Sequence, residues 1–391
     1  MKLAILTCGM LPIPAIQGGA VENLIDFYLE YNEKHQLHDI TVYSPWDPKI
    51  VHHPALSSNV NHYIFIDVNS LKARIERKLY GYLHHNEYYN HFIEYYFEKV
   101  YADLKKKNFD YIIIENGAGL AYKLSQRGYR NLILHMHNEV RPERSQYHEV
   151  VFGSFTKIIT VSDYIKQKAA AFYPIEKIHT VHNGIDLQNF SRKKEPTVSR
   201  QDLGFSVNDF VMVYNGRINP EKGVSELIEA MLQLKDHTNI KLMIIGGSFF
   251  GSTNNEDTFV RSLKDKAHDV KDRIFFTGFI PYKNVPDYLK LADIAVLPSM
   301  WEEPFGLTIV EAMAAGLPLI TTRSGGIPEI CEGVATIVER DGIVMNLVNS
   351  ILNLYKHPQE RKQASEKAFI RVQQFDKSIY AQQFLSRIID L

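Results

Sequence analysis

The sequence has few cysteines, no long apolar run and no excess of either charge. Cys8 and Cys331 are its two cysteines, too few for a disulfide framework, as is typical of proteins in a reducing cytosol. No run of about 18 apolar residues is present, so no membrane-spanning helix is expected. The 44 basic and 45 acidic residues nearly cancel, which leaves no overall field to attract nucleic acid. These absences indicate a cytoplasmic protein that does not bind nucleic acid.

Two further absences concern the start of the chain. The apolar part of MKLAILTC is far shorter than the core of a secretion signal, so residues 3–6 are better interpreted as a buried strand. No G-x-G-x-x-G follows this strand, which argues against a dinucleotide-dependent dehydrogenase.

Short apolar runs alternate with amphipathic helical stretches along the whole chain. Because the runs are apolar throughout, they are typical of parallel strands covered by helices on both faces. Strands are expected at residues 3–6, 40–44, 111–116, 131–137, 157–162, 178–183, 210–216, 241–247, 273–280, 293–299 and 317–322. With 391 residues the chain is also too long for one core. The pattern predicts an α/β protein of two doubly wound, Rossmann-like domains that face each other across a cleft.

The boundary between the domains is expected in the polar, charged stretch 189–204, with a hinge near residues 185–205. The first domain is assigned to residues 1–190 and the second to residues 191–375. Residues 376–391 are a last helical segment that could return to the first domain. Ligands are expected outside the carboxyl ends of the strands.

Two glycines, Gly18 and Gly19, follow the first strand and precede a helical stretch. Glycines there let a phosphate or a sugar approach the backbone at the positive end of a helix. They also suit a plain strand-to-helix turn, so both interpretations stay open.

Two cations lie five residues apart in the loop after a later strand. Gly216 ends that strand, Arg217 follows it, and Lys222 precedes the next helix. A guanidinium, an ammonium and a helix N-terminus aimed at one point favour a diphosphate ligand over two unrelated surface charges.

Two acids, Glu303 and Glu311, lie at the start of a buried, Ala-rich helix in WEEPFGLTIVEAMAAGLP. The helix is expected to begin near residues 306–307, after the break at Pro304. The N–H groups of residues 305–308 are then free to bind an anion. A ribose diol suits the Glu311 carboxylate and a sugar suits Glu303, whereas a favourable interaction with the helix dipole would explain only Glu303.

His135 and His137 lie on one face of an expected strand, with His137 at its carboxyl end. That position favours a functional histidine over a structural one. Metal ligation by the pair is not expected, because no third ligand is spaced to complete a site. Both histidines remain candidates, and we prefer His137.

These motifs together resemble a known family. G-R-x-x-P-E-K-G, E-P-F-G-L-x-x-x-E-A-M-A-x-G-x-P and S-G-G-I-P-E-I resemble the large retaining glycosyltransferase family 4, which has the GT-B fold. The resemblance covers nearly the whole chain and is dense from Val211 to Ile330. Spacing from Glu303 to Glu311 is that of the family's E-x7-E motif. The start of the chain looks most like members from bacterial cell-surface polysaccharide synthesis and the spore coat.

The resemblance implies a role for each matching residue. Arg217 and Lys222 would bind the diphosphate of the donor, and Glu311 its ribose. Glu303 and His137 would lie at the catalytic site. The other residues implied to bind substrate are Gly18, Gly19, Gly216, Phe279, Phe305, Gly306, Leu307 and Thr308.

The implied activity is transfer of a hexosyl unit from a nucleotide diphosphate sugar to a sugar or lipid-linked saccharide, with retention of the anomeric configuration. A UDP-sugar is the expected donor and GDP-mannose the alternative. Many glycosyltransferases hold a metal with a D-x-D motif. None occurs here, so no metal and no cofactor are expected. The alternatives are a nucleotide-sugar 2-epimerase and a non-catalytic sugar-binding protein of the same fold.

Two stretches of the first domain have no assigned role. Residues 71–85 mix basic and apolar side chains at helical spacing, which suits either a peripheral contact with the inner membrane face or a packed helix with a solvated basic face. Residues 80–101 are dense in tyrosine and histidine. They could stack on acceptor sugars or cover a lipid carrier, or they could form one long helix with its aromatics in the core.

Overall fold

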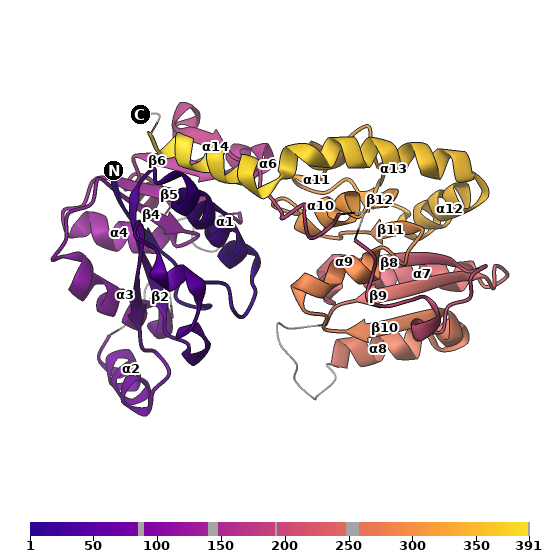
Figure 1. Ribbon diagram of the computed structural model, residues 1–391, viewed down its shortest axis with the longest axis horizontal. Helices are drawn as coiled ribbons and strands as arrows, with labels where there is room; N and C mark the ends of the chain where they lie inside the picture. The colour runs from indigo at the N-terminus through magenta and orange to yellow at the C-terminus, as the bar shows by residue number, and fades with distance from the viewer. Residues whose placement is uncertain (85–89, 140–147, 192–193, 248–257, 390–391) are drawn as a thin grey trace. The chain divides into compact units, whose positions relative to one another are not determined.

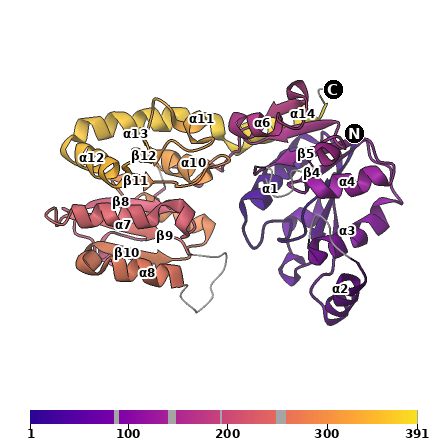
Figure 2. The ribbon, with the colours of Figure 1, turned by 180° about the vertical axis from the view of Figure 1, so that it is seen from behind.

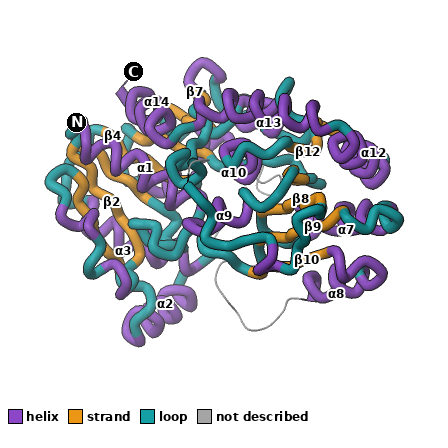
Figure 3. Tube along the Cα trace, turned by 45° about the vertical axis from the view of Figure 1, so that its right-hand side comes forward, coloured by secondary structure: helices purple, strands orange, loops and turns teal. Residues whose placement is uncertain are grey.

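The computed structural model describes residues 1–84, 90–139, 148–191, 194–247 and 258–389. It divides into two compact units. Unit 1 comprises Met1–Gly184 together with Lys377–Leu391, and unit 2 comprises Ile185–Asp376. Each unit has helices around a parallel sheet, drawn as purple helices around orange strands in Figure 3.

Unit 1 contains one seven-stranded sheet in the order β3-β2-β1-β4-β5-β6-β7, in which every neighbouring pair is parallel. The strands are β1 (Lys2–Leu6), β2 (Asp39–Pro45), β3 (Asn61–Ile66), β4 (Tyr111–Glu115), β5 (Leu132–Met136), β6 (Lys157–Thr160) and β7 (Ile178–Thr180). The strand order reverses between β1 and β4. In doubly wound folds, ligands bind at the carboxyl ends of the strands at such a switch point.

The helices of unit 1 include one from the far end of the chain. They are α1 (Ala20–His35), α2 (Leu71–Leu83), α3 (His91–Leu104), α4 (Ala118–Gln126), α5 (His148–Phe152), α6 (Asp163–Ala169) and α14 (Lys377–Ile389). In Figures 1 and 2, α14 runs beside α1. Phe384 of α14 stacks on Tyr28 of α1 with ring centres 4.6 Å apart, and both belong to the core that covers β1.

Unit 2 repeats the arrangement with a six-stranded parallel sheet in the order β10-β9-β8-β11-β12-β13. Its strands are β8 (Phe210–Asn215), β9 (Ile240–Ile245), β10 (Ile274–Gly278), β11 (Ile294–Leu297), β12 (Leu319–Thr322) and β13 (Thr336–Val338). Its helices are α7 (Val224–Gln233), α8 (Thr258–Lys266), α9 (Val285–Leu289), α10 (Leu307–Ala314), α11 (Ile327–Cys331), α12 (Ile343–Lys356) and α13 (Pro358–Val372). The switch point of this sheet lies between β8 and β11.

Short 3₁₀ helices complete the two units. They are η1 (Pro48–Ile50), η2 (Pro54–Ser57), η4 (Ile175–Lys177), η5 (Gln201–Leu203), η6 (Pro220–Lys222), η7 (His268–Arg273), η8 (Tyr282–Asn284) and η9 (Gln373–Phe375). Among the described helices, none combines the length and the apolar run that crossing a membrane requires.

The predicted α/β architecture of two doubly wound units is confirmed, and every strand expected from the sequence is present. Strands β3 and β13 were not predicted from the sequence. Both are edge strands. Most of β3 is only partly buried, although its residues 63–66 are apolar, and β13 has only three residues.

Of the two alternatives for residues 80–101, the one with a single long helix was wrong in its continuity. Helix α2 ends at Leu83 and α3 begins at His91, and residues 85–89 lie outside the described part of the chain. The aromatic side chains of Tyr95, Tyr96 and Phe97 in α3 are buried, as the packed-helix interpretation expects.

Candidate active site

Glu303 lies in the loop between β11 and α10, and two other loops hold it there. Lys222 forms an ion pair with its carboxylate, and the Ser299 hydroxyl donates to the same oxygen, Oε1, over 3.1 Å. The Gly326 N–H donates to the carbonyl oxygen of Glu303 over 2.8 Å. Gly325 has φ of +50°, and a Cβ there would lie 2.2 Å from that carbonyl oxygen. Only glycine permits this approach.

Lys222 ends η6, and its loop is tied to the loop that carries Glu303. The Met300 N–H donates to the carbonyl oxygen of Glu221 over 2.8 Å. The Lys222 ammonium lies 5.1 Å from the centre of the Trp301 ring, within range of a cation–π contact. The ammonium is therefore held between a carboxylate and an aromatic face, where a ligand with negative charge could compete for it.

Arg217 follows β8, and its side chain is exposed. The turn that carries it is close to the start of α10, because a Cβ on Gly216 would lie 3.8 Å from Cγ2 of Thr308. Within the described residues no acidic side chain pairs with Arg217. The structure thus brings Lys222 and Glu303 into contact and leaves the guanidinium of Arg217 accessible.

Glu311 lies in the second turn of α10, which begins at Leu307 as predicted. Only 6% of the residue is exposed. Its Oε2 accepts a hydrogen bond over 2.6 Å from Nδ2 of Asn215, the last residue of β8. Burial raises the pKa of Glu311 to about 7, although the hydrogen bond from Asn215 acts to lower it.

The remaining predicted residues of unit 2 differ in exposure. Phe305 is buried and packs edge-on against Phe375 with ring centres 5.9 Å apart, so its side chain belongs to the core. The side chain of Phe305 therefore does not face a ligand. Gly306, with φ of +113°, forms the N-cap of α10, and Leu307 and Thr308 are partly exposed. Phe279 follows β10 and is 46% exposed.

In unit 1, Gly18 and Gly19 form the turn into α1, with φ of +76° and +111°. A Cβ on Gly19 would lie 2.1 Å from Oε2 of Glu22. The turn therefore leaves room for this carboxylate to fold back over the start of the helix. Burial raises the pKa of Glu22, and the nearby His137 acts to lower it, which places Glu22 within electrostatic range of the histidine.

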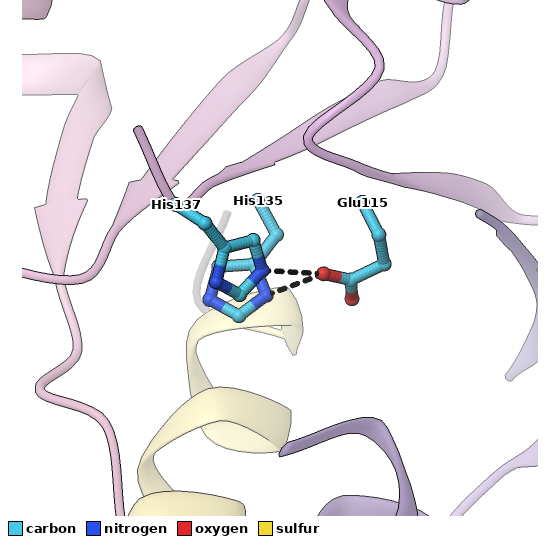
Figure 4. Close-up of side chains that lie close together, drawn as sticks. All are labelled: Glu115, His135 and His137. Carbon is cyan, nitrogen blue, oxygen red and sulfur yellow. Dashed lines mark hydrogen bonds and ion pairs between the residues drawn. The ribbon is translucent and has the colours of Figure 1, made fainter. Parts of the chain in front are cut away.

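Glu115, the last residue of β4, joins both histidines. Its Oε2 lies 2.9 Å from Nδ1 of His135 and 2.8 Å from Nε2 of His137. Figure 4 shows both rings turned toward this one oxygen. The Tyr28 hydroxyl donates to the other oxygen, Oε1, over 2.9 Å. All three members of the cluster are buried, with His137 the most exposed at 7%.

The expectation that nothing could complete a metal site beside the two histidines was wrong. The ligand atoms of Glu115, His135 and His137 lie within 4.8 Å of one another. Two imidazoles and a carboxylate are a donor set that Zn²⁺ accepts. The observed nitrogen–oxygen separations are those of hydrogen bonds, so the cluster is also complete without an ion.

Three residues of the site, Glu115, Asn215 and Ser299, were not predicted from the sequence. A signal for two of them was present, since Glu115 and Asn215 are polar residues that end otherwise apolar strands. In parallel sheets such positions lie where ligands bind. Ser299 had no comparable signal, because its partner Glu303 is reached only through the fold of the loop.

Comparison with known proteins places the chain in a family. Residues 27–189 match the model described as Glycosyltransferase Family 4, and residues 197–371 match the model described as Glycosyl transferases group 1. The Bacillus subtilis (strain 168) protein named "Putative glycosyltransferase YtcC" is 30% identical over 384 residues, covering 94% of this chain and 83% of that protein. This chain belongs to the family 4 glycosyltransferases.

Two further comparisons agree with the assignment of this chain to the family 4 glycosyltransferases. Spore coat protein SA of Bacillus subtilis (strain 168) is 29% identical over 347 residues, covering 85% of this chain and 83% of that protein. The crystal structure of Anabaena HepE in complex with UDP shares 22% identity, with a TM-score of 0.76 and full coverage of both chains. HepE shows that the glycosyltransferase has the GT-B fold. As a member of this family, the enzyme uses a nucleotide-sugar donor.

Proposed function

We propose that this enzyme moves a hexosyl unit from a nucleotide diphosphate sugar to a saccharide or lipid-linked saccharide, with retention of the anomeric configuration and without a metal. The observation that carries the proposal is the Lys222–Glu303 ion pair before α10. It lies beside the switch point of unit 2, where doubly wound folds bind ligands. Cell-surface polysaccharide synthesis, at the inner face of the membrane, is the proposed setting.

Positive charge around the proposed diphosphate site supports a metal-free reaction. When the bond from C1 to the diphosphate oxygen breaks, the leaving group gains negative charge that must be stabilised. Arg217, Lys222 and the N–H groups at the start of α10 supply positive charge for it. The acceptor oxygen bonds to C1 on the face that the diphosphate leaves, and the acceptor proton passes to the departing phosphate oxygen. Glu303 then needs to take no proton; it contacts the sugar and orients Lys222.

The buried carboxylate of Glu311 suits the ribose of the donor. Asn215 engages Oε2, which leaves Oε1 for a ribose hydroxyl. The exposed Phe279 is available to contact the base. A uridine nucleotide is our first choice, supported by the UDP bound to HepE, and GDP-mannose is the alternative. Neither the 2-epimerase nor the non-catalytic interpretation is favoured, because the site residues are present and both matching family models describe glycosyltransferases.

The decisive experiment measures thermal stabilisation of the purified protein by a panel of UDP- and GDP-sugars, with and without EDTA. A donor at 100 times its dissociation constant stabilises the folded state by about 2.7 kcal/mol, which raises Tm. We expect one donor to raise Tm by the same amount with and without EDTA. A shift that disappears with EDTA would contradict the metal-free proposal, and no shift with any donor would contradict donor binding itself. Transfer with the selected donor, followed by NMR of the anomeric proton, then tests retention.

Contact with an anionic membrane is the second part of the proposal, and α2 carries it. Leu71, Ile75, Leu79, Tyr82 and Leu83 are between 53% and 88% exposed. Their spacing places the first four on one face of the helix. That face is bordered by the exposed basic residues Lys72, Arg74 and Lys78.

The opposite face of α2 packs on the rest of unit 1 with its polar groups paired. Glu76 accepts hydrogen bonds from Tyr95 and Lys99, and Arg77 lies over the Phe92 ring of α3. A packed helix with a solvated basic face accounts for only part of α2, since the apolar side chains also face outward. Apolar residues bordered by cations suit an anionic lipid surface, where each cation contributes roughly 1 kcal/mol.

A further inference from the structure

The Glu115 carboxylate accepts hydrogen bonds from three side chains at once. Tyr28 donates to Oε1, and His135 and His137 both lie at hydrogen-bond distance from Oε2. An ionised carboxylate can only accept. Burial disfavours a charged carboxylate, but three hydrogen-bond donors around Glu115 favour its ionised form. Nδ1 of His135 and Nε2 of His137 must therefore each carry a hydrogen and donate it to Glu115.

His137 uses only one of its ring nitrogens in this arrangement. Nε2 donates to Glu115, while Nδ1 has no partner among the described residues and is not closed off from solvent. The ring of His137 is buried, which disfavours the charged imidazolium and favours the neutral imidazole. A neutral imidazole has one N–H, so Nδ1 presents a bare lone pair that can accept a hydrogen bond.

His135 shares Oε2 of Glu115 with His137, and its buried ring does not reach a ligand. Its Nδ1 donates to Glu115, and its ring packs 4.6 Å from the Phe384 ring and 6.5 Å from the Tyr380 ring. Its Nε2 is buried with no hydrogen-bond partner in the described structure.

We propose that Glu115, supported by Tyr28 and His135, is a positioning residue that holds His137 in the neutral Nε2–H tautomer, so that Nδ1 accepts a hydrogen bond from a hydroxyl of the sugar substrate. The identity of the ligand as a sugar rests on the proposed function. The assignment of the tautomer does not rest on the proposed function, because the tautomer is a property of unit 1 in the absence of any ligand. A sugar hydroxyl is both donor and acceptor, and this arrangement requires it to donate.

The test is ¹⁵N NMR of the imidazole nitrogens in histidine-labelled protein without substrate, with His137 assigned from the His137→Gln variant. At pH 7.5 we expect a protonated Nε2 and an unprotonated Nδ1 on His137, and a mixture of tautomers in Glu115→Gln, whose amide can donate as well as accept. An Nδ1–H tautomer or an imidazolium in the wild type would overturn the proposal. So would an unchanged tautomer in folded Glu115→Gln. If that variant does not fold, the wild-type spectrum alone decides.

Metal binding is tested on the same samples. The cluster could hold Zn²⁺, so spectra are recorded with EDTA and with one equivalent of ZnCl₂. We expect no change in the shifts of His135 and His137. A stoichiometric zinc complex that shifts both histidines would replace the hydrogen-bonded arrangement and overturn the proposal.

Kinetics then separate positioning from a general structural effect. Glu115→Gln should lower kcat/KM for transfer on the order of 10- to 100-fold, the range for losing a hydrogen bond to a charged group. Affinity for the free nucleoside diphosphate, which the proposed function assigns to unit 2, should be unchanged. Equal losses in both readouts would indicate damage to the whole protein and contradict positioning. The expected tautomer in a protein that transfers no sugar would refute only the proposed function.

Discussion

Glu311 is a carboxylate that the fold removes from water while giving it one hydrogen bond. Its pKa rises from 4.5 to about 7 because of burial, so the folded protein binds a proton here at pH values where the unfolded chain has released it. The contribution of this group to stability is therefore complete below pH 4.5 and is lost as the pH rises through 7.

The substitution Glu311→Gln should remove this pH dependence. The shift corresponds to roughly 3 kcal/mol, so the wild type should lose up to that amount of unfolding free energy between pH 5 and pH 8 relative to the variant. Urea unfolding at several pH values measures the difference, with Glu366→Gln on an exposed helix face as control. Parallel pH curves for wild type and Glu311→Gln would contradict the prediction.

The Lys222–Glu303 ion pair is the second feature at the scale of single residues. Lys222→Ala and Glu303→Gln should each lower kcat/KM on the order of 100-fold, because charge-assisted contacts to the diphosphate and sugar are lost. The exposed Lys266–Glu229 ion pair in the same unit offers a matched control, and Lys266→Ala should leave turnover unchanged. Steady-state kinetics and circular dichroism of the purified variants check both points. Normal turnover of either site variant would exclude the assigned role.

At the scale of an element, the loop before α10 depends on the close approach of Gly325 to the Glu303 backbone. Gly325→Ala would place a Cβ 2.2 Å from the Glu303 carbonyl oxygen, so the loop must shift and activity should fall at least tenfold. Gly333→Ala is the control. Its φ of +79° gives a comparable backbone strain, but a Cβ there would meet nothing within 4 Å. If the two alanine variants have the same kcat/KM, the approach does not position Glu303.

Helix α2 is the element whose proposed role is simplest to separate from catalysis. The double substitution Ile75→Glu/Leu79→Glu should abolish sedimentation with vesicles of phosphatidylcholine and phosphatidylglycerol, since it puts acids on the exposed apolar face. Leu37→Glu, at another exposed leucine of unit 1, should sediment like the wild type. Binding that survives the double substitution, or is equal on vesicles without the anionic lipid, would contradict an anionic membrane as the partner.

At the scale of the whole molecule, the two units have separate cores, and the last helix belongs to the first unit. Phe384→Ala should destabilise unit 1 by about 3 to 5 kcal/mol, because a buried ring is removed from the core over β1. Hydrogen exchange should show faster exchange in β1, β4 and β5 and unchanged protection in β8 and β11. Phe369→Ala, at a 37% exposed site, is the control. Loss of protection in both units would contradict separate cores.

Much of the fold follows from local sequence pattern. Continuous apolar strands with amphipathic helices between them require a sheet covered on both faces, which is why two doubly wound units could be predicted. The start of α10, the glycine turn before α1 and the place of Glu311 inside its helix are likewise local. The missed strands β3 and β13 are at sheet edges, where this pattern weakens.

The sequence by itself determined which residues stand at strand ends and helix starts, because those places follow from periodicity and turn chemistry. Tertiary structure decided which of them meet. Glu115 reaches His135 because β4 and β5 are neighbours in the sheet, and Asn215 reaches Glu311 because α10 packs at the end of β8. It also decided that α2 turns its apolar face outward. Strand order and helix packing join residues far apart in the chain, and no local spacing records those pairings.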